Sequence, residues 1–130
     1  MKNFVKKLSM CIAITGLVFS IGGLKETSAI TMYGKISYMP DSMLGDIGHD
    51  GKAMTVNDAA VDISKFYSIP KGRAMIATNQ SNGKSATVYK WTSGDFAKYG
   101  VVLDVFIPVF RDKLGGSTTA RYISNGKVMY

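Results

Sequence analysis

Residue types that carry enzyme chemistry are scarce in this chain. There is one histidine, His49, and one cysteine, Cys11, and Glu26 is the last glutamate, so carboxylate chemistry after that point must use aspartate. Asp104 follows the apolar run Val101-Val102-Leu103, where partial burial would raise its pKa and suit it to act as an acid. The competing interpretation is that Asp104 caps the next turn or accepts backbone hydrogen bonds.

His49 lies in the segment Gly48-His49-Asp50-Gly51, beside a possible partner carboxylate. A catalytic triad would also need a serine next to the histidine in space, and the sequence contains no Gly-x-Ser-x-Gly elbow. We therefore interpret His49 as an exposed loop residue that borders a substrate groove.

Aromatic side chains favour glycan binding, because a flat ring covers the apolar face of a sugar. Trp91, Phe96 and Tyr99 flank one polar loop, Thr92 to Gly100. The full set of candidate platform residues is Tyr33, Tyr38, Tyr89, Trp91, Phe96 and Tyr99. Tyr89 and Trp91 share one face of a strand by alternation, so the alternative for both is the core of the fold. The residues that we assign to the core directly are Phe66, Phe106, Val109 and Phe110.

The N-terminus has the pattern of a secretory signal over residues 1–29. Three lysines precede the apolar segment 8–24, and Thr27-Ser28-Ala29 offers small residues for cleavage. A membrane anchor is the alternative, because the apolar segment of 17 residues is at the lower limit for a span. Cleavage is the better interpretation, and it predicts a secreted, extracellular or wall-associated protein without a stable membrane anchor.

Residues 30–130 then form a mature chain of 101 residues, which suits one small domain. The signal takes with it four of the 16 basic and one of the nine acidic side chains, which leaves a net charge of +4. Residues 30–130 contain no cysteine, which excludes a disulfide framework, a thiol nucleophile and a thiolate zinc site in the mature chain. Their single histidine cannot build a multi-histidine metal centre. We expect no metal and no cofactor. The basic residues are dispersed, so we expect no nucleic acid as partner. The net charge of +4 favours either an anionic wall polymer as partner or solubility alone.

Short β-strands separated by turns dominate the expected secondary structure. The predicted strands are residues 30–38, 52–55, 73–78, 84–91, 101–103, 117–123 and 127–130. Asn82-Gly83 predicts a hairpin between the third and fourth of them. A brief helical turn is expected at 59–61, and a helix from Pro108 to about Leu114, stopped by Gly115-Gly116. This pattern predicts an all-β fold with one short helix, a small barrel.

The order of several short motifs resembles the double-psi β-barrel domain of the rare-lipoprotein-A (RlpA-like) and expansin family. The matching segments are Tyr33-Gly34-Lys35-Ile36-Ser37-Tyr38, Ile69-Pro70-Lys71-Gly72, Ala77-Thr78-Asn79, Asn82-Gly83-Lys84-Ser85 and Val101-Val102-Leu103-Asp104. The resemblance covers most of the mature chain and implies a six-stranded double-psi β-barrel. It also implies a protein that binds or remodels cell-wall polysaccharide, with peptidoglycan as the expected glycan.

The same resemblance nominates site residues and shows where the chain departs from the family pattern. Asp104 matches the family's second catalytic aspartate. Thr92 stands at the position of the first, and Asp95 follows three residues later. The small hydroxyl residue of the first strand has no clear counterpart, because Ser37 is followed by Tyr38-Met39. The substrate-binding residues that we predict are Trp91, Thr92, Tyr38, Phe96, Tyr99 and His49.

Three functions follow as hypotheses. The first is a secreted protein that binds or remodels peptidoglycan with a degenerate catalytic site. The second is an active RlpA-like lytic transglycosylase that uses Asp104 and Asp95. The third is a secreted protein-binding module, such as a protease inhibitor, that presents the loops Asp41 to Gly51 and Thr92 to Gly100 to a protein target.

Overall fold

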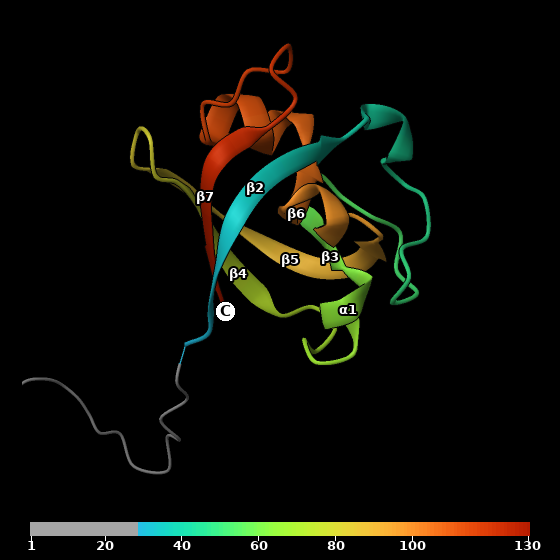
Figure 1. Ribbon diagram of the computed structural model, residues 1–130. Helices are drawn as coiled ribbons and strands as arrows, with labels where there is room; N and C mark the ends of the chain where they lie inside the picture. The colour runs from blue at the N-terminus through green and yellow to red at the C-terminus, as the bar shows by residue number, and fades with distance from the viewer. Residues whose placement is uncertain (1–28) are drawn as a thin grey trace, which may run out of the picture.

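The computed structural model describes residues 29–130, which form a closed six-stranded β-barrel (Figure 1). The predicted signal, residues 1–29, lies outside the described residues except for Ala29. The strands are β2 (Thr31–Met39), β3 (Asp58–Asp62), β4 (Ala74–Asn79), β5 (Lys84–Gly94), β6 (Val101–Phe106) and β7 (Ile123–Met129). The helices are η2 (Asp41–Met43), α1 (Ile63–Phe66), η3 (Ala97–Tyr99) and η4 (Pro108–Lys113). The prediction of a small all-β barrel is therefore confirmed.

Around the barrel the strands follow the order β2-β6-β3-β5-β4-β7, and β7 pairs back with β2. Two pairs are parallel, β2 with β6 and β3 with β5, and the others are antiparallel. The arrangement has an internal symmetry. If β2, β3 and β4 exchange places with β5, β6 and β7, in that order, the same pairs of neighbouring strands result. The two ends of the domain meet, because Ile30 and Tyr130 exchange backbone hydrogen bonds of 2.9 and 3.0 Å.

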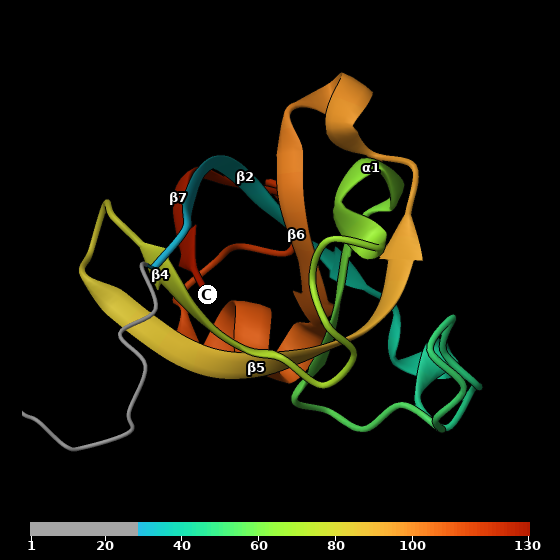
Figure 2. The ribbon, with the colours of Figure 1, turned by 90° about the horizontal axis from the view of Figure 1, so that it is seen from below.

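Apolar side chains fill the interior, and short helices cover the ends of the barrel. Figure 1 shows η4 at one end and α1 towards the other. Val109 and Phe110 of η4 are buried with the strand residues of the main core, as predicted. A second, smaller cluster joins the strand residues Met39, Ala60 and Phe106 to Met54 from the loop between β2 and β3. Figure 2 shows this loop projecting from the side of the barrel beside β5.

The hairpin and the helix that follows β6 agree with the local sequence signals. Asn82-Gly83 lies between β4 and β5, and Gly83 takes the left-handed conformation with a φ of 78°. Pro108 begins η4, and Gly115, with a φ of 71°, follows its end. Glycine adopts this conformation without the steric cost of a side chain.

Two boundary predictions around the central strands are wrong. The helical turn expected at 59–61 is strand β3, all five of whose residues are buried between β5 and β6. Small alanines fit there because the strand is covered on both faces. A strand buried on both faces lacks the alternation of apolar and polar residues that identifies a strand with one exposed face. Asp104 was expected to end its strand, but β6 continues through it to Phe106 because β2 and β3 pair with this segment on both sides.

Three further boundaries differ from the sequence prediction. Residues 52–55 form no strand, and only an isolated bridge joins Ile47 to Ala53. The expected loop from Thr92 begins later, because β5 continues to Gly94 beside β3. The two strands expected at 117–123 and 127–130 are one strand, β7, which begins only at Ile123.

Ser124-Asn125-Gly126 has the composition of a turn, but it lies inside β7. Its glycine is needed there because β7 approaches β2 closely. Gly126 lies opposite Gly34 of β2, and a Cβ added to Gly126 would lie 2.5 Å from the Gly34 carbonyl oxygen and 2.8 Å from Cγ1 of Ile36. Glycine in a strand interior often marks such an approach of two backbones. None of the helices in residues 29–130 is long and apolar enough to cross a membrane.

We expect Gly126→Ala to destabilise the barrel by about 1 to 3 kcal/mol, because the added methyl group forces β2 and β7 apart. Urea denaturation with linear extrapolation measures the change. Gly83→Asn is the control, since no atom lies within 4 Å of a Cβ there and asparagine tolerates the left-handed conformation. Equal stability of Gly126→Ala and the wild type would show that the two strands separate at little cost.

Candidate functional site

A carboxyl and a hydroxyl from neighbouring parallel strands form the centre of the candidate site. Ser37 of β2 lies in register with Asp104 of β6, and its Oγ donates a 3.0 Å hydrogen bond to Oδ1 of Asp104. Burial raises the pKa of Asp104 to about 6, and the hydrogen bond from Ser37 opposes this rise. Asp104 can therefore carry a proton at mildly acidic pH, when ordinary aspartates have lost theirs.

The strand register places Thr92, which the resemblance alone aligns with an aspartate of the RlpA-like family, on the same transverse row as Asp104. Ser37, Asp104, Ala60 and Thr92 are successive partners across β2, β6, β3 and β5. Partners on adjacent strands project from the same face of the sheet, and two strand spacings separate Asp104 from Thr92 by roughly 9 to 10 Å. Thr92 is buried, and its Oγ1 accepts a 3.1 Å hydrogen bond from the His49 backbone nitrogen. Its hydroxyl is thus occupied in holding a loop.

A cavity of about 350 Å³ lies beside this row. Its walls are Ser37, Tyr38, Arg121 and Tyr122, so the serine that binds Asp104 also lines the cavity. Tyr38 is fixed at the wall, because its hydroxyl donates a 2.9 Å hydrogen bond to the Thr118 carbonyl. Its ring also contacts the ring of Phe110, with centroids 5.0 Å apart. The cavity can hold a small part of a polar ligand next to the Ser37–Asp104 pair.

Ser37 is a residue of the candidate site that the sequence analysis did not predict. The sequence contained its motif, Gly34-Lys35-Ile36-Ser37-Tyr38, but not the register that brings Ser37 to Asp104. The two residues are 67 positions apart, and only the parallel pairing of β2 with β6 makes them neighbours.

Asp95, the other predicted catalytic residue, lies at the surface. Its side chain is 76% exposed and pairs with Lys98 at 3.5 Å, an arrangement of little energetic weight. A different aspartate organises this loop. Asp62 accepts hydrogen bonds of 2.9 and 2.7 Å from the backbone nitrogens of Phe96 and Ala97. The pKa of Asp62 is lowered to about 2, mainly because its carboxylate accepts a hydrogen bond from the Ser64 hydroxyl.

The candidate aromatic residues occupy separate places on the barrel. Trp91 is half-buried beside Gly72, while Tyr89 is exposed on the outer face of β5, so the alternative that Tyr89 belongs to the core is wrong. Phe96 packs against the second apolar cluster, and Tyr99 is exposed on η3. Of the predicted aromatic residues, Tyr38 lines the cavity.

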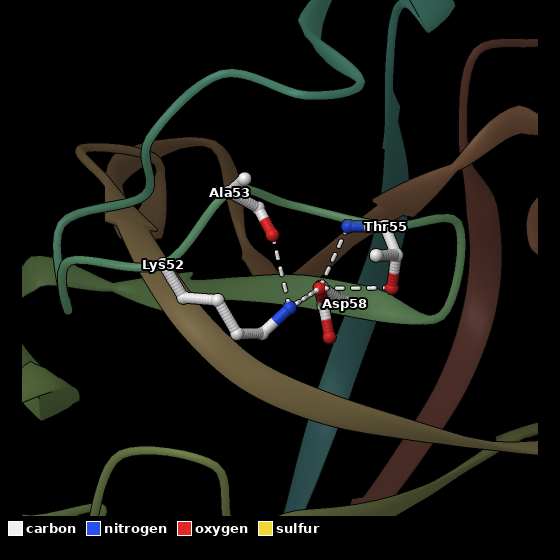
Figure 3. Close-up of polar contacts among 4 residues, drawn as sticks. All are labelled: Lys52, Ala53, Thr55 and Asp58. Atoms are coloured by element: carbon white, nitrogen blue, oxygen red, sulfur yellow. Dashed lines mark hydrogen bonds and ion pairs between the residues drawn. The ribbon is translucent and has the colours of Figure 1, made fainter.

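A buried aspartate anchors the loop between β2 and β3 (Figure 3). Oδ2 of Asp58 accepts from the Thr55 backbone nitrogen at 2.7 Å and from the Thr55 hydroxyl at 3.0 Å, and it pairs with Nζ of Lys52 at 2.6 Å. The Lys52 ammonium also donates to the Ala53 carbonyl and lies 5.1 Å from the Trp91 ring centroid. These contacts fix the loop and one face of Trp91 together.

The same loop carries a buried ion pair that the sequence analysis did not predict. Lys90 is 2% exposed, and its Nζ lies 2.9 Å from Oδ2 of Asp50 and 3.6 Å from the centre of the Phe66 ring. The Asp50 contact lacks hydrogen-bond alignment, so we treat it as an ion pair. Alternation offered a signal, because Lys90 follows Val88, a natural core residue, by two positions, and side chains two positions apart in a strand point to the same face.

His49 is exposed, as predicted, and the fold brings a serine to it. Nδ1 of His49 lies 2.7 Å from Oγ of Ser93, and the His49 ring stacks on Phe66 with centroids 4.1 Å apart. A Ser-His-Asp triad would require a carboxylate that orients the imidazole. The adjacent Asp50 instead pairs with Lys90, so we interpret the His49–Ser93 contact as part of the loop anchor.

Within residues 29–130, no three His, Cys, Asp or Glu side chains gather as metal ligands would. A scan against protein-family models finds no match for this sequence, and a search of curated proteins finds none either.

Proposed function

We propose that this protein is a secreted double-psi β-barrel of the RlpA and expansin type that binds or remodels cell-wall polysaccharide. Peptidoglycan is the expected glycan. The observation that carries the proposal is the Ser37–Asp104 pair beside the cavity that Ser37 and Tyr38 line. Sugar hydroxyls can exchange hydrogen bonds with the serine and the carboxyl, and the Tyr38 ring offers an apolar surface to a sugar face.

The site has one suitable carboxyl, which favours binding or remodelling over ordinary hydrolysis. Hydrolases that use two carboxylates place them roughly 5 to 9.5 Å apart across the scissile bond. Thr92 occupies the equivalent place on the transverse row, and Asp95 is exposed and paired with Lys98. Neither of these two predicted positions therefore supplies a second carboxylate beside Asp104.

Lytic transglycosylation is the second candidate, and the raised pKa of Asp104 favours it. Asp104 would donate its proton to the oxygen of the leaving sugar while the glycosidic bond breaks. A hydroxyl group of the substrate would then bond to the anomeric carbon, and its proton would return to the Asp104 carboxylate. One acid that later acts as a base suffices, because the substrate supplies the nucleophile.

Purified peptidoglycan separates these candidates. We expect the wild-type protein to pellet with insoluble peptidoglycan at low salt, and less of it to pellet as the salt concentration rises. If transglycosylation occurs, a zymogram shows clearing that Asp104→Asn reduces by about 100-fold or more. Asp112→Asn is the matched control, since Asp112 is exposed on η4 and paired with Arg111.

Each outcome has a distinct meaning. Pelleting without clearing supports the binding protein, and clearing that Asp104→Asn abolishes supports the enzyme. Clearing that survives this substitution would exclude Asp104 as the acid. A wild-type protein that does not pellet with peptidoglycan at low salt would overturn the proposed function.

A further inference from the structure

Arg121 adopts a backbone conformation that its residue type avoids. Its φ is 74°, and every other residue with positive φ in the described part of the chain is glycine. Arg121 follows the turn from Ser117 to Ala120, and its backbone nitrogen donates a 3.2 Å hydrogen bond to the Ser117 carbonyl. Glycine is strongly preferred where a turn ends in this way, because other side chains crowd the backbone. An arginine here is an unfavourable local choice, and such choices cluster at functional sites.

The Arg121 side chain is available to a ligand. It is exposed, it lines the cavity with Ser37, and it forms no ion pair with any acidic residue in the described range 29–130. A second cation lies nearby, because Nζ of Lys35 is 4.8 Å from the ring centre of Tyr122 on the same wall. The cavity therefore has positive charge at its edge and the Ser37–Asp104 pair beside it.

We propose that Arg121 binds an oxyanion carried by the glycan, so that the ligand of this cavity is an anionic polysaccharide. The planar guanidinium presents paired N–H donors that match a carboxylate or a phosphate group. This assignment rests on the proposed glycan binding and adds to it the charged substituent and the residue that selects it. The strained backbone holds the guanidinium at the cavity edge, next to the sugar that Ser37 and Asp104 contact.

Binding to chemically modified peptidoglycan tests the charge. Four preparations are needed: peptidoglycan stripped of phosphate-bearing polymer, the same material with its carboxyls amidated, unstripped peptidoglycan, and unstripped peptidoglycan with amidated carboxyls. We expect Arg121→Gln to weaken binding by roughly 10- to 100-fold wherever the anion is present. Arg111→Gln is the control for charge, because Arg111 lies on η4 and not at the cavity, and it should match the wild type within about twofold.

The preparations also identify the anion. If amidation reduces binding to the stripped peptidoglycan, the anion is a carboxylate. If binding to the unstripped peptidoglycan persists after amidation, the anion is a phosphate. Equal binding of Arg121→Gln and the wild type on all four would overturn the inference while leaving glycan binding intact. No binding of the wild type to any preparation would instead reject the proposed function, and this inference with it.

A comparison of Arg121→Gly with Arg121→Ala tests the strain separately, since both variants lose the guanidinium. Only alanine keeps a side chain in the left-handed conformation, so we expect the glycine variant to melt about 4 °C or more above the alanine variant. Both should bind as weakly as Arg121→Gln. A glycine variant that melts at or below the alanine variant would contradict the idea that the backbone is strained to place Arg121.

Discussion

Replacing Asp50 with alanine should destabilise the barrel by about 3 to 5 kcal/mol, the range for removing one partner of a buried ion pair. The Lys90 ammonium would remain almost fully buried against Phe66, with no carboxylate beside it. Domains of this size have a total stability of about 5 to 15 kcal/mol, so the loss is a large fraction of the whole. Urea denaturation measures it.

Two further variants show whether the unpaired charge is the cause. The double variant Asp50→Ala with Lys90→Met should recover part of the loss, because it leaves no buried charge without a partner. Asp112→Ala breaks an exposed pair, whose side chains are 55% and 60% exposed, and should cost less than about 1 kcal/mol. If Asp50→Ala costs no more than Asp112→Ala, Lys90 reaches water in the native state and the ion pair is not needed.

Asp104→Asn should stabilise the protein at neutral pH by about 2 to 3 kcal/mol and have little effect on stability near pH 4. The folded-state pKa of Asp104, about 6, lies above its ordinary value of 3.8, so folding favours the protonated carboxyl. Below about pH 3.8 the carboxyl is protonated in both states and carries no penalty. As the pH rises from about 4 to 6, the unfolded state loses its proton first and the folded state becomes relatively less stable.

Urea titrations of the wild type and Asp104→Asn between pH 4 and pH 8 measure this difference. The asparagine amide oxygen can still accept the hydrogen bond from Ser37, so the substitution removes mainly the charge. Asp95→Asn is the control, because its side chain is exposed and its stability difference should not change across this range. A difference between wild type and Asp104→Asn that is constant with pH would mean that the Asp104 carboxyl is well solvated.

Local sequence signals predicted the parts of the fold that depend on local conformation. The Asn82-Gly83 hairpin, the start of η4 at Pro108 and its end near Gly115 each depend on a few adjacent residues, and each agrees with the structure. The strand β3 was missed for the opposite reason. Its alanines favour helix by intrinsic propensity, and only burial between two neighbouring strands decides in favour of a strand.

The arrangement of the site depended on information that the sequence does not contain. The family resemblance nominates Asp104, and the apolar run before it predicts partial burial, but its partner Ser37 is set by the register of two parallel strands. Lys90 is one of the dispersed basic residues, and lysine is rarely buried without a partner. Its partner Asp50 lies 40 positions away in a loop whose path only the folded chain reveals.

The position of β2 between β6 and β7 has a consequence for how this chain folds. Among residues 29–130, β2 is the first strand to be made, and it acquires both of its neighbours only when β6 and β7 exist, so this barrel cannot close on the growing chain. Folding that waits for such distant pairings is slow, in the range of milliseconds to seconds. During that interval β2 has two open edges and binds other extended chains readily. The same delay leaves the newly made chain without a closed barrel, and only a chain that has not yet folded can be threaded through a narrow channel.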